Sequence, residues 1–207
     1  MRFLLVAALA IVCARPALAG TPVVDPPNCT VPSMILLVGA NGVVADPLGA
    51  FSVTVRDFNN FPMANSTVTI KFYCAGIRIC QYQAGLIVDC SNREVMTAAG
   101  PGGVATFSLV GTASPDNCTP DDPSCAAVYA DGVLLRYISI AALDLDGVPG
   151  LTGEDLAVWL GDYFCGTYTP RLDYNADGLL TGGDLSFWLG AFFGGHSVNG
   201  CSTTLCN

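Results

Sequence analysis

Oxygen-bearing side chains recur between Asp173 and Asp184 at a spacing that could bind a hard metal ion. The segment starts with the letters Asp-Tyr-Asn-Ala-Asp-Gly. Oxygen side chains therefore occupy positions 1, 3, 5 and 12 of a twelve-residue loop, and glycine occupies position 6. A hard cation of this kind seeks about six to eight oxygen ligands, and the glycine permits the sharp turn that lets them converge. The spacing predicts a calcium ion bound by Asp173, Asn175, Asp177 and Asp184.

A second copy of this loop begins 29 residues earlier in the chain. Asp144, Asp146 and Asp155 occupy its positions 1, 3 and 12, and both copies end in the letters Leu-Thr-Gly, any residue, Asp-Leu. Val148 and Pro149 stand at positions 5 and 6, where a carboxylate and the turn glycine belong. The first loop is therefore either a weak calcium site or an empty loop with a structural role, and both interpretations stay open.

Apolar residues that follow each loop predict two helices. They recur at steps of one, three and four residues, which places them in a stripe on one helical face. The stripes comprise Leu156, Trp159, Leu160 and Phe164 after the first loop, and Leu185, Trp188, Leu189 and Phe192 after the second. We expect the two stripes to bury each other. Neither loop is preceded by a recognisable helix, since a short strand-like run precedes the first and Thr169-Pro170 the second.

A calcium loop with only an exiting helix, present twice, resembles the dockerin type I repeat, which is half of an EF-hand. The resemblance covers residues 143–193. It implies docking to a cohesin-like receptor or another cell-surface protein. It also implies ligand roles: side-chain oxygens from Asp173, Asn175, Asp177 and Asp184, the carbonyl of Leu179, and a water-bridged contact from Thr181. Loop positions 10 and 11, which dockerins use to read cohesin, are Gly153-Glu154 and Gly182-Gly183 here and depart from the usual pair of small hydroxyl residues.

The N-terminus has the features of a secretory signal peptide. A charged start is followed by a short apolar run and by small residues that end at Ala19. We expect cleavage after Ala19, which makes residues 1–19 the signal peptide and the mature protein secreted. No second run approaches the ~20 apolar residues that a membrane-spanning helix requires, so no membrane span is expected.

Charge excludes two classes of partner. The chain carries a net charge of −9, and from Asp144 onward it has eight acidic residues against one basic residue, Arg171. Nucleic acids and anionic membranes require basic surfaces, so neither is expected as a partner. An acidic C-terminal third is what a calcium-binding segment would show.

Cysteine usage agrees with export. Nine of the ten cysteines remain after cleavage, and they match no zinc-binding spacing. We expect disulfides, of which Cys118–Cys125 and Cys80–Cys90 could clip loops, although the connectivity cannot be derived. The odd count leaves one thiol free or intermolecular. Residues 194–207 form a short tail that contains two of these cysteines.

The segment from residue 20 to residue 142 alternates apolar and polar residues with period two, as half-buried strands do. Val68, Ile70 and Phe72, which alternate with Thr67, Thr69 and Lys71, are an example. Turn signals, among them Asp131-Gly132, separate about seven short strands, which predicts an antiparallel β-sandwich. The stretches 52–57, 62–70 and 103–109 are similar to a bacterial Ig-like domain of the Big-1, invasin-related kind. This resemblance implies a stalk or an adhesive module. The fold class we expect is mainly β plus a small all-α part, with an Ig-like sandwich followed by a dockerin-like pair of calcium loop-helix repeats.

Few side chains in the sequence could act as a nucleophile or a general base. We therefore expect no enzyme, no catalytic residue and no organic cofactor. Ser197 lies in a poor match to a nucleophile elbow, and its neighbour His196 is the single histidine, so no second histidine can serve as the base. A pair of carboxylates for glycoside hydrolysis is harder to exclude, because it needs only two acids several ångströms apart.

The function we expect is extracellular attachment or assembly by a secreted, non-catalytic, calcium-binding protein. The alternative is an accessory carbohydrate-binding component of a polysaccharide-degrading, cellulosome-like system. Aromatic side chains aligned on one exposed sheet face would favour that alternative, and Tyr73, Tyr82, Tyr129 and Tyr137 are the candidates.

Overall fold

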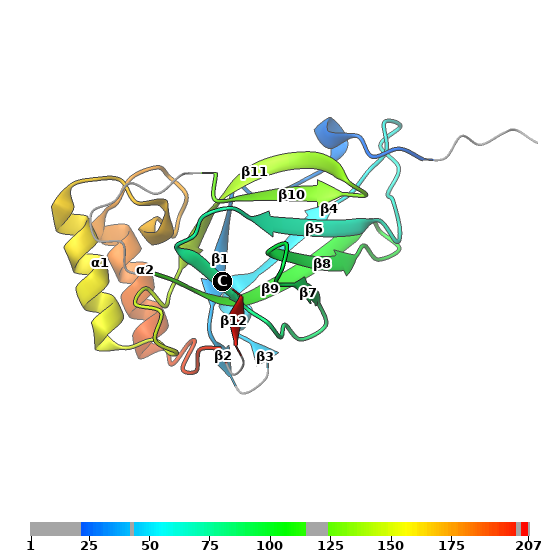
Figure 1. The fold of residues 1–207 in the computed structure, drawn as a ribbon. Helices are drawn as coiled ribbons and strands as arrows, with labels where there is room; N and C mark the ends of the chain where they lie inside the picture. The colour runs from blue at the N-terminus through cyan, green and yellow to red at the C-terminus, as the bar shows by residue number, and fades with distance from the viewer. Residues whose placement is uncertain (1–21, 42–43, 115–123, 202–203, 207) are drawn as a thin grey trace, which may run out of the picture.

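The computed structural model describes residues 22–41, 44–114, 124–201 and 204–206. The expected signal peptide, residues 1–19, and Cys118 lie outside these ranges. The described part of the chain is mainly β, as the sequence predicts. Figure 1 shows the strands on one side of the molecule and the two α-helices together on the other.

The elements follow one another along the chain with short connections. The strands are β1 (Met34–Val38), β2 (Ala40–Asn41), β3 (Val44–Ala45), β4 (Ala50–Thr54), β5 (Thr67–Phe72), β6 (Ile77–Cys80), β7 (Ile87–Asp89), β8 (Glu94–Ala98), β9 (Val104–Ala113), β10 (Ala126–Ala130), β11 (Val133–Ala142) and β12 (Leu205–Cys206). The helices are α1 (Gly153–Cys165) and α2 (Gly182–Phe193), with short 3-10 turns at Pro26–Asn28, Pro47–Gly49 and Pro170–Leu172.

Ten strands join in one hydrogen-bonded sheet, and β2 and β3 form a separate small hairpin. The main order is β12-β6-β9-β1-β11-β10-β5-β8-β7, with β4 paired to β9. The sheet curves into half a barrel rather than dividing into the two sheets of the expected sandwich. Most pairs are antiparallel as expected, but β1 runs parallel to both β9 and β11.

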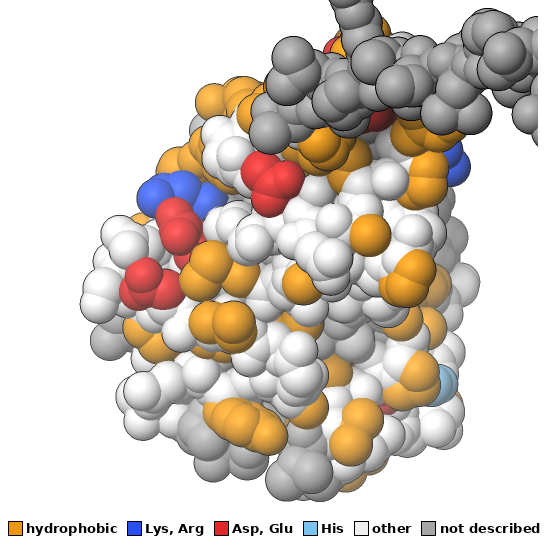
Figure 2. Space-filling model, turned by 90° about the vertical axis from the view of Figure 1, so that its right-hand side faces the viewer, with side chains coloured by type: hydrophobic (Ala, Val, Ile, Leu, Met, Phe, Trp, Pro, Cys, Tyr) orange, Lys and Arg blue, Asp and Glu red, His pale blue; other side chains and the backbone are white. Residues whose placement is uncertain are grey.

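The alternating pattern places its apolar residues in the core. Val68, Ile70 and Phe72 of β5 are buried, and the polar residues between them are not. The tight turn predicted between β10 and β11 is present, with Asp131 and Gly132 at φ values of 47° and 79°. Positive φ at both central residues matches the twist of the flanking strands. On the face shown in Figure 2, hydrophobic side chains are scattered among polar ones rather than gathered in one patch.

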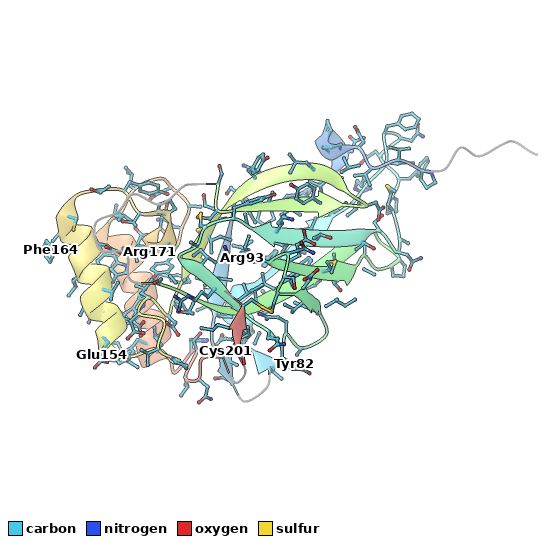
Figure 3. All side chains as sticks on the ribbon, viewed as in Figure 1. Tyr82, Arg93, Glu154, Phe164, Arg171 and Cys201 are labelled. Atoms are coloured by element: carbon cyan, nitrogen blue, oxygen red, sulfur yellow. A yellow bond between two sulfur atoms is a disulfide. The ribbon has the colours of Figure 1, made fainter. Side chains whose placement is uncertain are left out.

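The two helices begin as their sequences predict. Thr152 and Thr181 each accept a hydrogen bond at the helix N-terminus, and each is part of a reciprocal capping box. Trp159 and Trp188 are buried in the same apolar core as the sheet residues. The apolar stripes therefore pack on the core of the sheet and not only on each other. Phe164 at the end of α1 points outward, with 79% of its surface exposed (Figure 3).

Polar contacts attach the helical part to the sheet. The indole N–H of Trp188 donates to the carbonyl of Leu143 at 3.1 Å, and the hydroxyl of Tyr174 donates to the carbonyl of Ala142 at 2.9 Å. Ala142 is the last residue of β11, and Leu143 follows it directly. Arg171 forms a fully buried ion pair with Asp162 at 2.6 Å. The acidic loops are consequently built onto the sheet. Neither α-helix of the described residues has the length and apolar character needed to cross a membrane.

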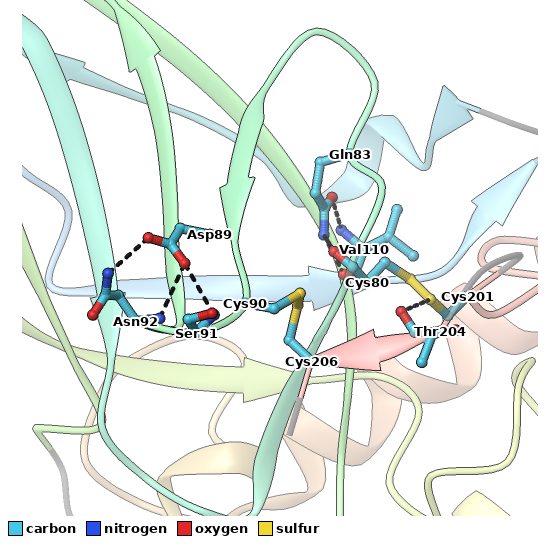
Figure 4. The surroundings of a disulfide bond; sticks show 10 residues. All are labelled: Cys80, Gln83, Asp89, Cys90, Ser91, Asn92, Val110, Cys201, Thr204 and Cys206. Atoms are coloured by element: carbon cyan, nitrogen blue, oxygen red, sulfur yellow. Dashed lines mark hydrogen bonds between the residues drawn. A yellow bond between two sulfur atoms is a disulfide. The ribbon is translucent and has the colours of Figure 1, made fainter.

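Disulfides are present, as expected from the cysteine usage, but the two local pairs suggested by the sequence are wrong. The structure joins Cys74 to Cys125, Cys80 to Cys201 and Cys90 to Cys206. Figure 4 shows how the last two tie β12 and the residues before it to the sheet, where β12 pairs with β6. Cys165 is also disulfide-bonded, and Cys29 is the free cysteine among the described residues.

Candidate metal centre

Three carboxylates of the first acidic loop converge in the structure. Ligand atoms of Asp144, Asp146 and Asp155 all lie within 4.8 Å of one another. Asp144 and Asp155 are buried, and Asp146 is half-buried. Two oxygens bound to one calcium ion lie at most about 5 Å apart, since each calcium–oxygen distance is about 2.3 to 2.6 Å. The donor set and its spacing fit one hard cation.

Backbone N–H groups fix the carboxylate that closes this loop. Asp155 Oδ1 accepts from the amides of Leu145 at 2.6 Å and Asp146 at 3.1 Å, while Oδ2 accepts from the amide of Thr152 at 2.7 Å. Asp155 is the third residue of α1, so its position also follows from the capping box. The loop folds around this side chain from both ends.

A residue from the sheet orients the first carboxylate. The hydroxyl of Thr112, which is buried in β9, donates to Asp144 Oδ1 at 2.6 Å. The amide of Gly147 donates to the same oxygen at 3.0 Å. Sequence analysis missed Thr112, because it lies 32 residues before Asp144 and no local spacing connects them.

The missing turn glycine of the first loop is replaced by the next residue. Gly178 has a φ of 81° at position 6 of the second loop, whereas Gly150 at position 7 of the first loop has a φ of 108°. Pro149 therefore does not prevent the chain from turning. Val148 remains a lost ligand, and its side chain is 59% exposed.

The second loop repeats the closing hydrogen bonds of the first. Asp184 accepts from the amides of Tyr174 and Thr181, each at 2.9 Å. These two donors stand 29 residues after Leu145 and Thr152, which make the same bonds to Asp155. The duplication seen in the sequence is thus a duplication of local structure.

The remaining side chains of the second loop are more open. Asp173 is buried, and its Oδ2 accepts from the hydroxyl of Tyr168 at 2.8 Å and from the amide of Gly178 at 2.9 Å. Asn175 and Asp177 are exposed. Their side-chain oxygens accept from backbone amides two residues further along the chain, Asp177 accepting from Leu179 at 2.8 Å.

The structure therefore gathers the acidic side chains of the two loops unequally. Across the described residues, the triad of the first loop is the one group of three acidic, histidine or cysteine side chains with ligand atoms this close. Asp173, Asp177 and Asp184 do not form such a group. Thr181 serves as the helix cap, and the side chain of Leu179 is exposed. Tyr168, which holds Asp173, is a second positioning residue that sequence analysis missed.

Burial makes the first loop costly to ionise without a cation. It raises the pKa of Asp144 to about 7, and repulsion from Asp155 and Asp146 adds to this effect. Burial also raises the pKa of Asp155, against the lowering effect of its backbone hydrogen bonds. Two buried acids beside a third carboxylate favour either protonation or a bound positive ion.

The serine that imitates a nucleophile elbow is not accessible. Ser197 is 1% exposed, and its hydroxyl accepts a hydrogen bond from the amide of Gly39 at 2.9 Å. Nδ1 of His196 lies 3.0 Å from a carboxylate oxygen of the buried Asp46. Asp46 also accepts the amide of Ser197 at 2.8 Å. These residues connect the C-terminal segment to the turn before β4.

No protein-family model, no curated protein and no solved structure matches the chain. The geometry of the two loops and of the sheet is therefore the basis for a functional proposal.

Proposed function

We propose that residues 143–193 are a calcium-binding module of the dockerin type and that the protein serves extracellular attachment or assembly. The observation that carries this proposal is the repeated loop. Asp155 and Asp184 accept hydrogen bonds from equivalent amides and then open equivalent helices. Calcium is the preferred ion, because all side-chain donors are oxygens.

The strand-rich segment from residue 20 to residue 142 would be the stalk or adhesive part. Parallel pairing of β1 with β11 in the interior of the sheet and burial around one apolar core support a compact, rigid carrier. Export through a cleaved signal peptide is consistent with the disulfides, which persist in oxidising compartments. We propose no catalytic residue, since the carboxyl groups of the first loop converge as metal ligands and Ser197 is buried.

Calorimetric titration of the mature chain with calcium and, separately, with magnesium tests the metal site. We expect calcium to bind and to raise the unfolding temperature, and Asp184→Asn to weaken both effects. Glu154→Gln is the matched control, because Glu154 is an exposed acid at the start of α1 that is not a predicted ligand. Absence of calcium binding at millimolar concentration would refute the module.

Affinity capture from the extracellular fraction tests the docking role. The mature chain should retain a protein partner in calcium and release it in chelator, and the Asp184→Asn variant should not retain it. If the variant retained the partner equally well, attachment would not depend on calcium binding by the loops.

A second candidate function is carbohydrate binding in a polysaccharide-degrading system. The observation that favours it is the exposure of tyrosines on the sheet. Tyr73 is 45% exposed and Tyr137 is 53% exposed, and neither is part of the core. Tyr73 and Tyr129 also share a hydrogen bond between their hydroxyls at 2.8 Å.

A further inference from the structure

A pocket lies on the surface of the sheet, away from the acidic loops. It is formed over β5, β8 and β10, which are adjacent in the sheet order and are drawn in Figure 1. Its volume is 390 Å³, and it is lined by Thr69, Lys71, Tyr73, Glu94, Tyr129 and Gly132. This volume falls within the range of ~300 to 1,000 Å³ that is typical of small-molecule sites.

Register places the lining residues on one face. Lys71 pairs with Glu94 of β8, and Thr69 pairs with Tyr129 of β10. Tyr137 of β11 is opposite Ala127, two residues before Tyr129, and continues the same face. Aromatic rings and charged groups therefore line one side of the sheet.

The pocket combines aromatic surface with both donors and acceptors. Lys71 Nζ donates to Glu94 Oε1 at 2.7 Å, which uses one of the three N–H donors of the ammonium group. In the Tyr73–Tyr129 pair one hydroxyl donates, so the other retains its own proton for a ligand. Burial and the bond to Tyr129 raise the pKa of Tyr73 to about 12, which keeps this phenol neutral.

We infer that this pocket binds a sugar unit of a polysaccharide, stacked on Tyr73 and Tyr129 and held by Lys71 and Glu94. A pyranose ring offers an apolar C–H face to an aromatic ring and hydroxyls at its rim that both donate and accept. Glu94 accepts from such hydroxyls and Lys71 donates to them. The inference rests on the second candidate function and gives it a location.

Other ligand classes fit less well. The one ammonium and the one carboxylate of the lining neutralise each other, so the pocket offers no net charge to select an ion. A peptide that adds as a strand needs a free sheet edge. Strands β5, β8 and β10 are each paired on both sides, so none of them is an edge strand of the sheet.

Binding of the mature chain to soluble hexaoses of glucose, xylose, mannose and N-acetylglucosamine, measured by calorimetry, tests the inference. The same panel is repeated in affinity gels with the corresponding polysaccharides. We expect one class to bind, and Tyr73→Ala and Tyr129→Ala to weaken binding at least about tenfold. Tyr73→Phe keeps the ring and the fold, so it should keep most of the stacking and lose the hydroxyl contribution.

Tyr82→Ala is the matched control, because Tyr82 is 57% exposed but does not line the pocket. A sugar that binds the wild-type chain and the Tyr73→Ala variant equally would refute the pocket and leave the carbohydrate function standing. Absence of binding across the whole panel would refute both. Capture of a peptide that Tyr73→Ala releases would assign the pocket to a protein partner and overturn the inference.

Discussion

The hydroxyl of Thr112 in β9 donates a hydrogen bond of 2.6 Å to the carboxylate of Asp144 in the first acidic loop. Both residues are 4% exposed, so the bond is shielded from water. Asp144 is a candidate metal ligand. An ion that binds Asp144 therefore also stabilises the contact between the first loop and β9. Calcium should therefore stabilise the whole chain rather than its C-terminal third alone.

Thr112→Val should lower stability without changing the shape of the core. The valine is nearly isosteric but removes the donor, which leaves a buried carboxylate with one partner fewer, at a cost of ~1 to 3 kcal/mol. Calcium affinity should fall as well, because Asp144 loses its orientation. Urea unfolding and calorimetry measure the two effects. Thr106→Val is the control, since Thr106 lies on the same strand and is exposed; an equal loss in both variants would contradict the role of Thr112.

The two loops should bind calcium with different affinities, and the second should bind first. It supplies four oxygen side chains, Asp173, Asn175, Asp177 and Asp184, against three in the first loop. We expect Asp184→Ala or Asp173→Ala to abolish most of the calcium-induced rise in unfolding temperature and Asp144→Ala to have a lesser effect. Calorimetric titration of these variants resolves the sites. The ranking is wrong if Asp144→Ala is as damaging as Asp184→Ala.

Preorganisation acts against this ranking. The triad of the first loop has already converged, whereas the acidic side chains of the second loop must move together around an ion. Ordering side chains costs free energy, so the loop with more ligands gains less than their number suggests. Sequence could predict the ligand inventory from position alone. It could not predict convergence, which depends on Thr112 and on the turn at Gly150.

The same distinction holds for the fold. Alternation predicted which residues of β5 face the core, and the Asp131-Gly132 turn followed from its residue types. The alternation of apolar and polar residues does not reveal the direction of a strand. The parallel pairing of β1 was therefore not predicted. Disulfides such as Cys90–Cys206 span 116 residues and depend on which strands become neighbours. Close spacing in sequence was therefore a poor guide to cysteine pairing.

Removing the Cys90–Cys206 disulfide should destabilise the whole molecule. The bond closes a long loop and joins β12 to the residue that follows β7, so its loss should cost about 2 to 4 kcal/mol. The Cys90→Ser, Cys206→Ser double variant would show a lower unfolding temperature, and added reductant would lower that of the wild-type chain. Cys29→Ser should change little, since Cys29 is free. An unchanged unfolding temperature on reduction would contradict this prediction.

Ser197→Ala should affect stability and not catalysis. The hydroxyl of Ser197 satisfies the buried amide of Gly39, so the alanine leaves that donor unpaired at a cost of ~1 to 3 kcal/mol. We expect no turnover of esters or common polysaccharides by the wild-type chain. Activity assays and urea unfolding of both proteins check the two statements. Turnover that disappears in Ser197→Ala would overturn the non-catalytic interpretation.

Stability in the absence of calcium should fall as the pH rises from about 4 to about 7. Asp144 ionises near 3.8 in the unfolded chain, but burial raises its pKa to about 7 in the folded protein. Between these values the folded state holds a proton that the unfolded state has lost, so raising the pH favours unfolding. The burial-raised pKa of Asp155 acts in the same direction.

Calcium should reverse this dependence, because the ion requires both acids to be ionised and competes with their protons. Its affinity should therefore rise over the same interval in which the calcium-free protein loses stability. Thermal unfolding at several pH values, in calcium and in chelator, measures both curves. Asp144→Asn removes the titrating group and should flatten the curve in chelator, whereas Glu154→Gln should leave it unchanged. If the protein in chelator gained stability as the pH rises from 4 to 7, the raised pKa values of Asp144 and Asp155 would not be what determines the pH dependence of its stability.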